Sequence, residues 1–217
     1  MRHGRRRFPD RGAHLGLILA VARQIPAQER SLREGRWQTA LGEGLEGRTL
    51  GIIGLGKQGQ RVAKVALAFG MRVIAWSQNL TEETARASGA ERVSKETLLR
   101  ESDVVTLHLV LSERSRHTIG AAEIALMKPA AFLVNTSRGP LVDSAALEAA
   151  LRDKRIAGAA LDVFDDEPLP AGATIASLPS TVLTPHLGYV SPGAISRPST
   201  RGRWRISPPI WPGRRSG

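Results

Sequence analysis

Residues 49–59 read TLGIIGLGKQG, and this stretch decides the fold. The apolar run from Thr49 to Ile53 has the length and composition of a buried strand, and Gly54 to Gly59 then follows the pattern G-x-G-x-x-G. From Gln58 to Phe69 the apolar residues recur with helical spacing. A strand, a glycine-rich turn and a helix in this order predict a site in which backbone amides and the helix N-terminus hold a phosphate group.

The three glycines of the turn have separate expected roles. Gly54 permits the tight turn, Gly56 lets backbone amides approach a pyrophosphate, and Gly59 allows the helix to pack closely on the strand. Lys57 and Gln58 lie between the glycines, at the start of the helix. A glycine-rich turn without a ligand is the alternative, but the strand before it and the helix after it favour dinucleotide binding.

Strands and helices continue to alternate beyond this unit. Further strands are expected at 72–76, 104–107, 132–134, 157–161 and 182–183, and helices near 82–87, 123–127 and 144–152. This alternation predicts an α/β fold, a doubly wound parallel sheet with helices on both faces. We place the domain at residues 13–190, led by one helix from residue 13 to about 35.

The formal charge of +11 is concentrated at the two ends of the chain. Residues 1–12 hold five arginines against one acid, and residues 191–217 hold six arginines, five prolines and no acid. We expect both ends to be irregular, because neither has the apolar periodicity of a helix or a strand. The residues between them are close to neutral, so nucleic-acid binding through the arginine-rich ends is the least favoured hypothesis.

The start of the chain also imitates an export signal, because the arginines at 5–7 precede an apolar run at 15–22. That run is short, and its apolar residues recur with helical spacing, which favours an amphipathic helix. No run approaches the ~20 apolar residues that cross a membrane. The absence of cysteine excludes disulfides and sulfur-based zinc sites. We therefore expect a cytoplasmic protein without a metal or a membrane segment.

Three later segments each follow a predicted strand and supply a charged or titratable side chain. They read VNTSRG at 134–139, LDVFDDEP at 161–168 and LTPHLGY at 183–189. Because ligands of an open parallel sheet bind beyond the carboxyl ends of its strands, the three loops are expected to meet in one crevice. Arg138, Glu167 and His186 would then lie close together, although each taken singly is typical of an ordinary surface loop.

The four motifs, in this order, resemble the D-isomer-specific 2-hydroxyacid dehydrogenases over roughly residues 13–190. The resemblance implies a Rossmann-like fold, NAD or NADP as cofactor, and a small 2-hydroxy or 2-keto acid as substrate. In that family the residues matching Arg138, Glu167 and His186 are catalytic, and the segment around Asp162 lies against the nicotinamide end of the cofactor. The residues expected to bind the cofactor are Gly54, Gly56, Lys57, Gln58, Gly59, Ser77, Gln78, Asn79, Thr136, Ser137, Asp162 and Gly188.

The three catalytic candidates suit hydride transfer to a keto acid. Negative charge develops on the carbonyl oxygen, so a protonated His186 would donate a proton there and take it back in the oxidative direction. Glu167 would accept a hydrogen bond from the other imidazole nitrogen and favour the charged ring. Arg138 would hold the substrate carboxylate and polarise the keto oxygen with its planar fork of donors.

The end of the second strand leaves the choice between NAD and NADP open. NAD-selective proteins usually place an acid there to bind the adenosine ribose, whereas this chain has Ser77, Gln78 and Asn79. Without a carboxylate a 2′-phosphate is not repelled, which slightly favours NADP. Arg72 and Arg86 are the arginines nearest in sequence.

The resemblance covers only part of a typical family member, which has two lobes. It begins near residue 13 and stops after Tyr189, so the preceding substrate domain and the returning helix have no counterpart. We expect a chain truncated or frame-shifted at both ends, whose open site binds cofactor more readily than it turns over substrate. A non-catalytic NAD(P)-binding module is therefore the second hypothesis. The leading helix resembles one that packs between subunits, which predicts a homodimer.

One histidine and two tryptophans are expected to have structural roles. His108 lies in an apolar run, so we expect it to be packed or hydrogen-bonded and not catalytic. Trp37 and Trp76 are expected to serve packing.

Overall fold

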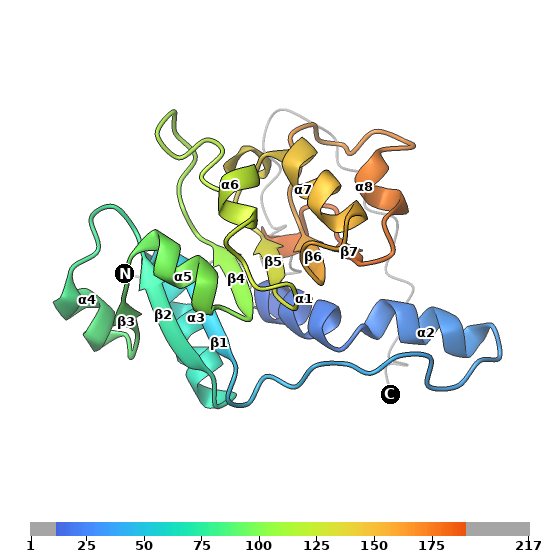
Figure 1. Ribbon diagram of the computed structural model, residues 1–217, viewed down its shortest axis with the longest axis horizontal. Coiled ribbons are helices and arrows are strands. Elements are labelled where there is room, and N and C mark those ends of the chain that lie inside the picture. The colour runs from blue at the N-terminus through green and yellow to red at the C-terminus, as the bar shows by residue number, and fades with distance from the viewer. Residues whose placement is uncertain (1–11, 190–217) are drawn as a thin grey trace, which may run out of the picture.

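The computed structural model describes residues 12–189, and its centre is a seven-stranded parallel sheet (Figure 1). The strands are β1 Thr49–Ile53, β2 Arg72–Trp76, β3 Glu91–Arg92, β4 Val104–Leu107, β5 Phe132–Asn135, β6 Gly158–Leu161 and β7 Thr181–Leu183. Their order across the sheet is β3-β2-β1-β4-β5-β6-β7. The order reverses between β1 and β4, which is the point where doubly wound folds bind ligands. The predicted fold class is confirmed.

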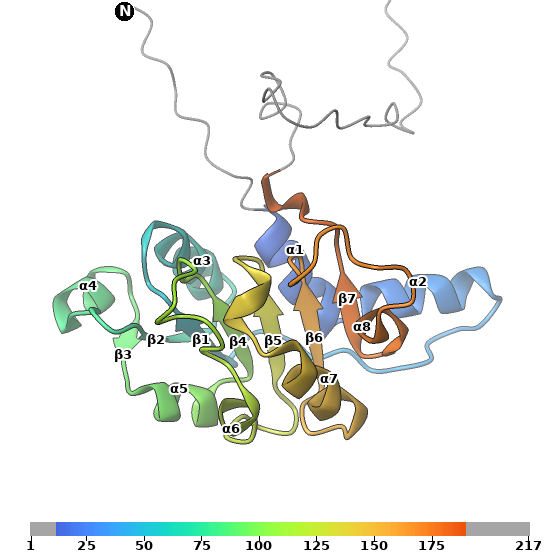
Figure 2. The ribbon, with the colours of Figure 1, turned by 90° about the horizontal axis from the view of Figure 1, so that it is seen from above.

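Helices cover both faces of the sheet. They are α1 Gly12–Ala22, α2 Ile25–Arg33, α3 Lys57–Ala68, α4 Glu82–Ala87, α5 Lys95–Glu101, α6 Ala121–Ile124, α7 Ser144–Arg152 and α8 Thr174–Ser177, with short 3-10 turns η1 Gly139–Leu141 and η2 Leu187–Tyr189. α1 and α3 pack on one face, and α5, α6 and α7 lie on the other (Figure 2). Each face therefore has its own hydrophobic core.

β1 shows why an uninterrupted apolar run forms the central strand. Leu50 and Ile52 belong to the core beneath α1 and α3, whereas Ile53 belongs to the core on the opposite face. Gly51 faces α5, where a Cβ would lie 2.7 Å from Leu98 Cδ2. Glycine therefore lets α5 pack closely on the strand, and burial on both faces replaces the usual apolar and polar alternation.

The single leading helix predicted for residues 13–35 is wrong. The chain forms α1 and α2 instead, and Gln24 between them has a left-handed φ of 52°. Pro26 lies in the first turn of α2. In a continuous helix its ring would collide with the carbonyl group of Ala22, and its nitrogen would have no proton to donate. The break lets α2 extend away from the sheet (Figure 1).

The prediction also misses several short elements. It omits β3, α5 and α8, and the helix expected near 123–127 is α6. A two-residue strand is too short to show a periodic pattern. The start of α5 did carry a signal, because the Ser94 side chain caps the helix by accepting a hydrogen bond from the Thr97 N–H.

We call residues 25–46, which comprise α2 and the segment that runs back from it, the arm. The side chains of Gln28 and Thr39 hydrogen-bond at 3.1 Å, which ties the returning segment to α2. Trp37 is 75% exposed and Leu41 94% exposed. The prediction that Trp37 serves packing is therefore wrong within one chain.

Trp76 at the end of β2 does pack, and Lys95 Nζ lies 5.8 Å from the centroid of one of its rings. Among residues 12–189 no helix combines the length and the hydrophobicity that crossing a membrane requires. The predictions for residues 1–11 and 190–217 lie outside the described residues.

Candidate cofactor and active site

The glycine-rich turn lies at the carboxyl end of β1. Gly54 has a φ of 101°, and its N–H donates to the Trp76 carbonyl oxygen at 2.8 Å. A Cβ on Gly54 would lie 2.8 Å from the carbonyl carbon of His108, and a Cβ on Gly59 would collide with the Gly54 oxygen. These two glycines are therefore required by the close approach of β1, β4 and α3.

Gly56 differs from its neighbours, because a Cβ built on it would meet no atom within 4 Å. It caps α3, a helix of 12 residues, without a side-chain hydrogen bond, and Lys57 is the exposed first residue of that helix. An open space in front of an uncapped helix N-terminus is what an anionic group needs. The turn thus fits the pyrophosphate of a dinucleotide.

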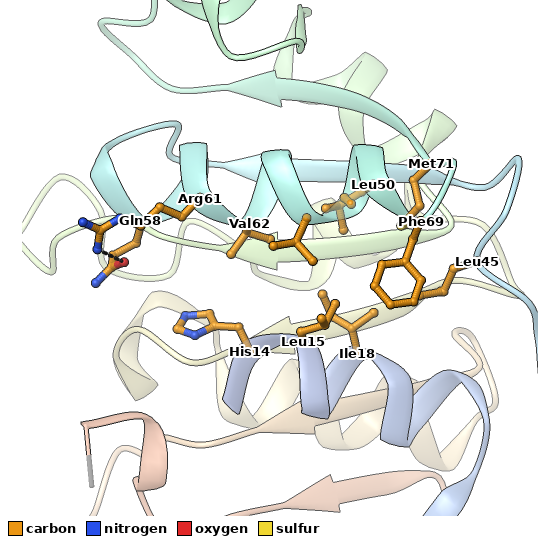
Figure 3. Close-up of a pocket in the computed structure, with 12 residues that line it drawn as sticks. His14, Leu15, Ile18, Leu45, Leu50, Gln58, Arg61, Val62, Phe69 and Met71 are labelled. Atoms are coloured by element: carbon orange, nitrogen blue, oxygen red, sulfur yellow. Dashed lines mark hydrogen bonds between the residues drawn. The ribbon is translucent and has the colours of Figure 1, made fainter. Parts of the chain in front are cut away.

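Gln58 lies at the edge of a groove between α1 and α3 (Figure 3). Its side-chain oxygen accepts a hydrogen bond from Arg61 Nη1 at 3.3 Å. The groove is lined mostly by apolar side chains such as Ile18, Val62 and Phe69. Such a lining does not suit phosphates or a keto acid, so we do not count the groove as part of the site.

Ser77, Gln78 and Asn79 form a turn directly after β2, closed by a hydrogen bond from the Leu80 N–H to the Ser77 carbonyl oxygen at 3.1 Å. This turn adjoins the glycine-rich turn, because β1 and β2 are paired. Arg72 lies at the opposite end of β2. Its side chain donates hydrogen bonds to Glu91 at 2.7 Å and Glu101 at 2.6 Å, so it is not available to hold a ribose phosphate.

The loop that carries Arg138 is held by the last residue of β5. Asn135 is buried, and its side chain donates to the Arg138 carbonyl oxygen at 2.8 Å and accepts from the Ser137 N–H at 3.1 Å. The Ser137 hydroxyl donates to the Leu107 carbonyl oxygen at 2.8 Å, which joins this loop to the end of β4. Thr136 Oγ1 is buried and has no hydrogen-bond partner among residues 12–189. An unpaired buried hydroxyl directly after β5 fits a bound ligand.

His186 and Glu167 are brought together from the loops that follow β7 and β6. His186 Nδ1 lies 2.7 Å from Glu167 Oε2, and Glu167 Oε1 accepts from the Phe164 N–H at 3.0 Å. Both side chains remain partly exposed. The pairing predicted between Glu167 and one imidazole nitrogen is therefore present.

The pKa of Glu167 lies below its ordinary value. Burial alone would raise this pKa. The hydrogen bonds from His186 and Phe164 outweigh burial, and the charge of Arg138 adds to their effect. Glu167 is thus held in its charged form beside the imidazole, and the guanidinium of Arg138 is near enough to act on it.

Asp162, the first residue after β6, is fully buried. Its carboxylate accepts hydrogen bonds from the Thr184 hydroxyl, from the Leu187 N–H at 2.7 Å and from the Gly188 N–H at 2.8 Å. The loop of His186 is consequently fastened to the end of β6. These contacts join segments far apart in the chain and could not be predicted from local pattern.

The side chain of His108 is partly buried, and its ring stacks on that of His14 with 5.1 Å between the ring centroids. Thr106 Oγ1 lies 3.2 Å from His108 Nε2. Burial first, and the neighbouring His14 second, lower the pKa of His108 to about 3. His108 is therefore a neutral, packed histidine, as predicted, whereas the sequence did not single out His14.

A continuous series of contacts joins the four motifs along one edge of the sheet. Gly54 packs on His108 after β4, and Ser137 bonds to the end of β4. A Cβ on Gly139 would collide with the Phe164 carbonyl group, so the Arg138 loop lies directly against the Glu167 loop. The predicted phosphate turn and the loops of Arg138, Glu167 and His186 thus share one rim. Residues 12–189 contain no group of three His, Asp or Glu side chains suited to a metal ion.

A parallel sheet with a dinucleotide turn and an Arg, Glu and His set at its carboxyl edge defines the class of the protein as a nucleotide-binding domain of a dehydrogenase type. Residues 15–188 match the model of the D-isomer specific 2-hydroxyacid dehydrogenase, NAD binding domain. The chain belongs to the D-isomer specific 2-hydroxyacid dehydrogenase family.

Similar proteins carry names of the same kind. A glyoxylate reductase of Aeropyrum pernix is 46% identical over 179 residues, which are 78% of this chain and 53% of that protein. A D-3-phosphoglycerate dehydrogenase of Methanocaldococcus jannaschii is 44% identical over 177 residues, covering 80% of this chain and 34% of that protein. The crystal structure of a glyoxylate reductase from Paecilomyes thermophila has a TM-score of 0.78 and 37% identity, covering 85% of this chain and 56% of that one. The chain thus spans about half the length of the glyoxylate reductases it matches.

Proposed function

We propose that this chain is the nucleotide-binding part of an NAD(P)-dependent oxidoreductase that interconverts a small 2-hydroxy acid and its 2-keto acid. The observation that carries the proposal is the 2.7 Å contact between His186 Nδ1 and Glu167, next to Arg138 and on the same rim as the glycine-rich turn. Relatives named glyoxylate reductase support a small 2-keto acid as the substrate class.

Different parts of the rim would bind different parts of the cofactor. The glycine-rich turn would hold the pyrophosphate, and the Ser77–Asn79 turn would meet the adenosine ribose. Thr136, Ser137, Asp162 and Gly188 belong to the loops that follow β5, β6 and β7, where the nicotinamide would lie. A nicotinamide ring bound there would supply or accept the hydride.

The side chains at that end would handle the substrate and the proton. Arg138 would hold the substrate carboxylate through paired hydrogen bonds. His186, oriented through Nδ1 by Glu167, would donate the Nε2 proton to the keto oxygen as the hydride reaches the carbonyl carbon. In the oxidative direction the same nitrogen would take the hydroxyl proton. Glu167 would stabilise the imidazolium and keep the ring in place.

We propose that NADPH is accepted as well as NADH. No carboxylate stands in the turn of Ser77, Gln78 and Asn79, so nothing there repels a 2′-phosphate. Arg72 is paired at the far end of its strand, and the hydroxyl and amide groups of the turn would donate to that phosphate.

The experiment that tests this function has two stages. Purified protein is titrated with NADH and NADPH by calorimetry, and cofactor oxidation is then followed with glyoxylate and with hydroxypyruvate. Saturable binding followed by oxidation supports the proposal, whereas the absence of binding to either cofactor overturns it. His117→Gln, a change of an exposed histidine that is not among the predicted site residues, is the control for both stages.

A non-catalytic NAD(P)-binding module is the second candidate. It is favoured by one observation, that the family model matching residues 15–188 is that of an NAD binding domain. The experiment above separates the two, because a binding module binds the cofactor and does not oxidise it with either acid.

We also propose that two chains associate through the arm. Its apolar side chains Ile25, Leu32, Trp37 and Leu41 are 51–94% exposed in the described part of the chain, residues 12–189. Sedimentation velocity should show a dimer for the wild-type chain and a monomer for a Trp37→Ser, Leu41→Ser variant. A wild-type monomer at micromolar concentration would contradict this.

A cytoplasmic location is part of the same proposal. The sequence has no cysteine, so its fold does not depend on an oxidising compartment. Cell fractionation of the tagged chain tests this, and recovery in an exported fraction would overturn it.

A further inference from the structure

Asp162 is the only buried acid among residues 12–189. Its carboxylate receives three hydrogen bonds, and all three donors belong to the loop of residues 184–188. The donors lie on both sides of His186 in sequence: the Thr184 hydroxyl precedes it, and the Leu187 and Gly188 amides follow it. One carboxylate directly after β6 thus holds both sides of the loop that carries the imidazole.

The backbone of His186 needs such a support. Its φ of 52° lies in the left-handed region, which residues other than glycine rarely adopt. Such a conformation persists only where the surrounding structure determines it. The bonds to Asp162 on either side of His186 provide that constraint, and His186 Nδ1 then meets Glu167 at 2.7 Å.

We propose that Asp162 is a positioning residue, which sets the orientation of His186 toward Glu167 and so prepares the imidazole for proton transfer. This inference rests on the proposed function, since it assigns His186 the part of the proton donor. Asp162 acts through the loop and does not itself touch the substrate. The role goes beyond contact with the cofactor, because the fully buried carboxylate has its bonds within the protein.

The hydrogen bonds of this loop require a carboxylate at position 162 and a glycine at position 188. The carboxylate accepts bonds on both oxygens, from Thr184 and Leu187 on Oδ1 and from Gly188 on Oδ2. An asparagine has only one acceptor oxygen. Its amide N–H would therefore point at the backbone N–H of either Leu187 or Gly188, and that hydrogen bond would be lost. A Cβ on Gly188 would lie 3.0 Å from Asp162 Oδ2, which is closer than ordinary packing allows, so glycine brings the amide within reach.

Two pairs of variants test the proposal. Asp162→Asn keeps the size of the side chain and removes one acceptor, and Asp166→Asn, an exposed acid four residues further along the chain, is its control. Thr184→Val removes the hydroxyl donor, and Thr184→Ser keeps it. The second pair keeps the test decisive if Asp162→Asn does not fold. Both Thr184 variants leave the Asp162 carboxylate and its hydrogen bonds from the Leu187 and Gly188 N–H groups in place.

The first readout is amide hydrogen exchange at Leu187 and Gly188, measured by NMR without cofactor. Loss of a hydrogen bond to a charged acceptor should speed exchange by about ten- to a hundredfold in Asp162→Asn. Thr184→Val should give a smaller increase, which Thr184→Ser restores. The second readout is the ring-nitrogen resonance of His186, which should lose the signature of the Glu167 hydrogen bond in Asp162→Asn and keep it in Asp166→Asn.

The outcomes separate this inference from the proposed function. Unchanged exchange and an unchanged His186 resonance in a folded Asp162→Asn protein would overturn the positioning role, even if cofactor binding and turnover are present. Failure to bind NADH or NADPH would overturn the proposed function and leave the loop measurements interpretable. Where turnover is measured, Asp162→Asn should lower kcat while changing the cofactor dissociation constant by less than about threefold; a loss confined to cofactor affinity would contradict positioning of His186.

Discussion

The two ends of the rim are built in different ways. The phosphate end comes from consecutive residues, 49–59, and offers backbone amides and an open space at Gly56. The hydride end comes from side chains on three loops after β5, β6 and β7, and these loops are held by Asn135, Asp162 and Glu167. A site of backbone atoms depends on glycine and helix geometry, whereas a site of side chains depends on bonds between distant segments. The predictions below use this difference.

The largest expected effect is at the hydride end. His186→Ala removes the proton donor, so oxidation of NADPH by glyoxylate should fall by about 10²- to 10⁴-fold. The dissociation constant for NADPH should change by less than about threefold, because the phosphate end is untouched. Undiminished turnover would remove His186 from the mechanism, and His117→Gln is the matched control.

The phosphate end should respond in the opposite way to Gly56→Val. The new side chain enters the open space in front of α3 without meeting protein atoms, so the fold should keep its melting temperature. The dissociation constant for NADPH should rise by about tenfold or more, because the side chain occupies the anion's place. Gly44→Val is the control, since Gly44 also has open space around it. Equal affinities for the two variants would show that the turn holds no pyrophosphate.

The contact between the Arg138 and Glu167 loops can be weakened through Gly139. In Gly139→Ala the new methyl group collides with the Phe164 carbonyl group, so the free energy of unfolding should fall by about 1–3 kcal/mol. Gly16→Ala, in α1 with open space around it, should instead raise stability by about 0.5–1 kcal/mol. Urea titrations measure both, and a Gly139→Ala protein as stable as the wild type would mean that the two loops do not touch.

The smallest expected effect is the pH dependence that Glu167 contributes. Its pKa is lowered in the folded chain from an ordinary value of 4.5, so its bonds stabilise the fold above that pH and are lost as the pH falls through the lower, folded pKa. The difference in unfolding free energy between wild type and Glu167→Gln should therefore shrink as the pH is lowered from above 4.5 through the folded pKa of Glu167. The effect is modest because the side chain is partly exposed. A difference independent of pH would contradict the assigned pairing.

The same contrast explains what could be predicted from the sequence. The glycine-rich turn was predictable because strand, turn and helix are adjacent, and each glycine has a local reason. The placement of Arg138, Glu167 and His186 on one rim followed from a general property of parallel sheets, that their carboxyl ends share an edge.

The failures concern effects that local patterns do not show. The spacing of apolar residues predicted one leading helix, but Pro26 is tolerated only in a first turn, so the chain breaks at Gln24. Asp162 could be placed after a strand, yet its three donors come from residues 184–188 and depend on the register of β6 with β7. Trp37 shows that an aromatic residue can be identified from the sequence without showing which surface buries it.

The central claim, that the phosphate turn and the three loops form one crevice, is tested most directly by titrating NADPH into ¹⁵N-labelled protein. The account predicts that the amide resonances of Gly56, Thr136 and Gly188 shift together with one dissociation constant, while that of Leu41 in the arm does not move. Shifts confined to residues around Gly56, or spread over both faces of the sheet, would contradict it.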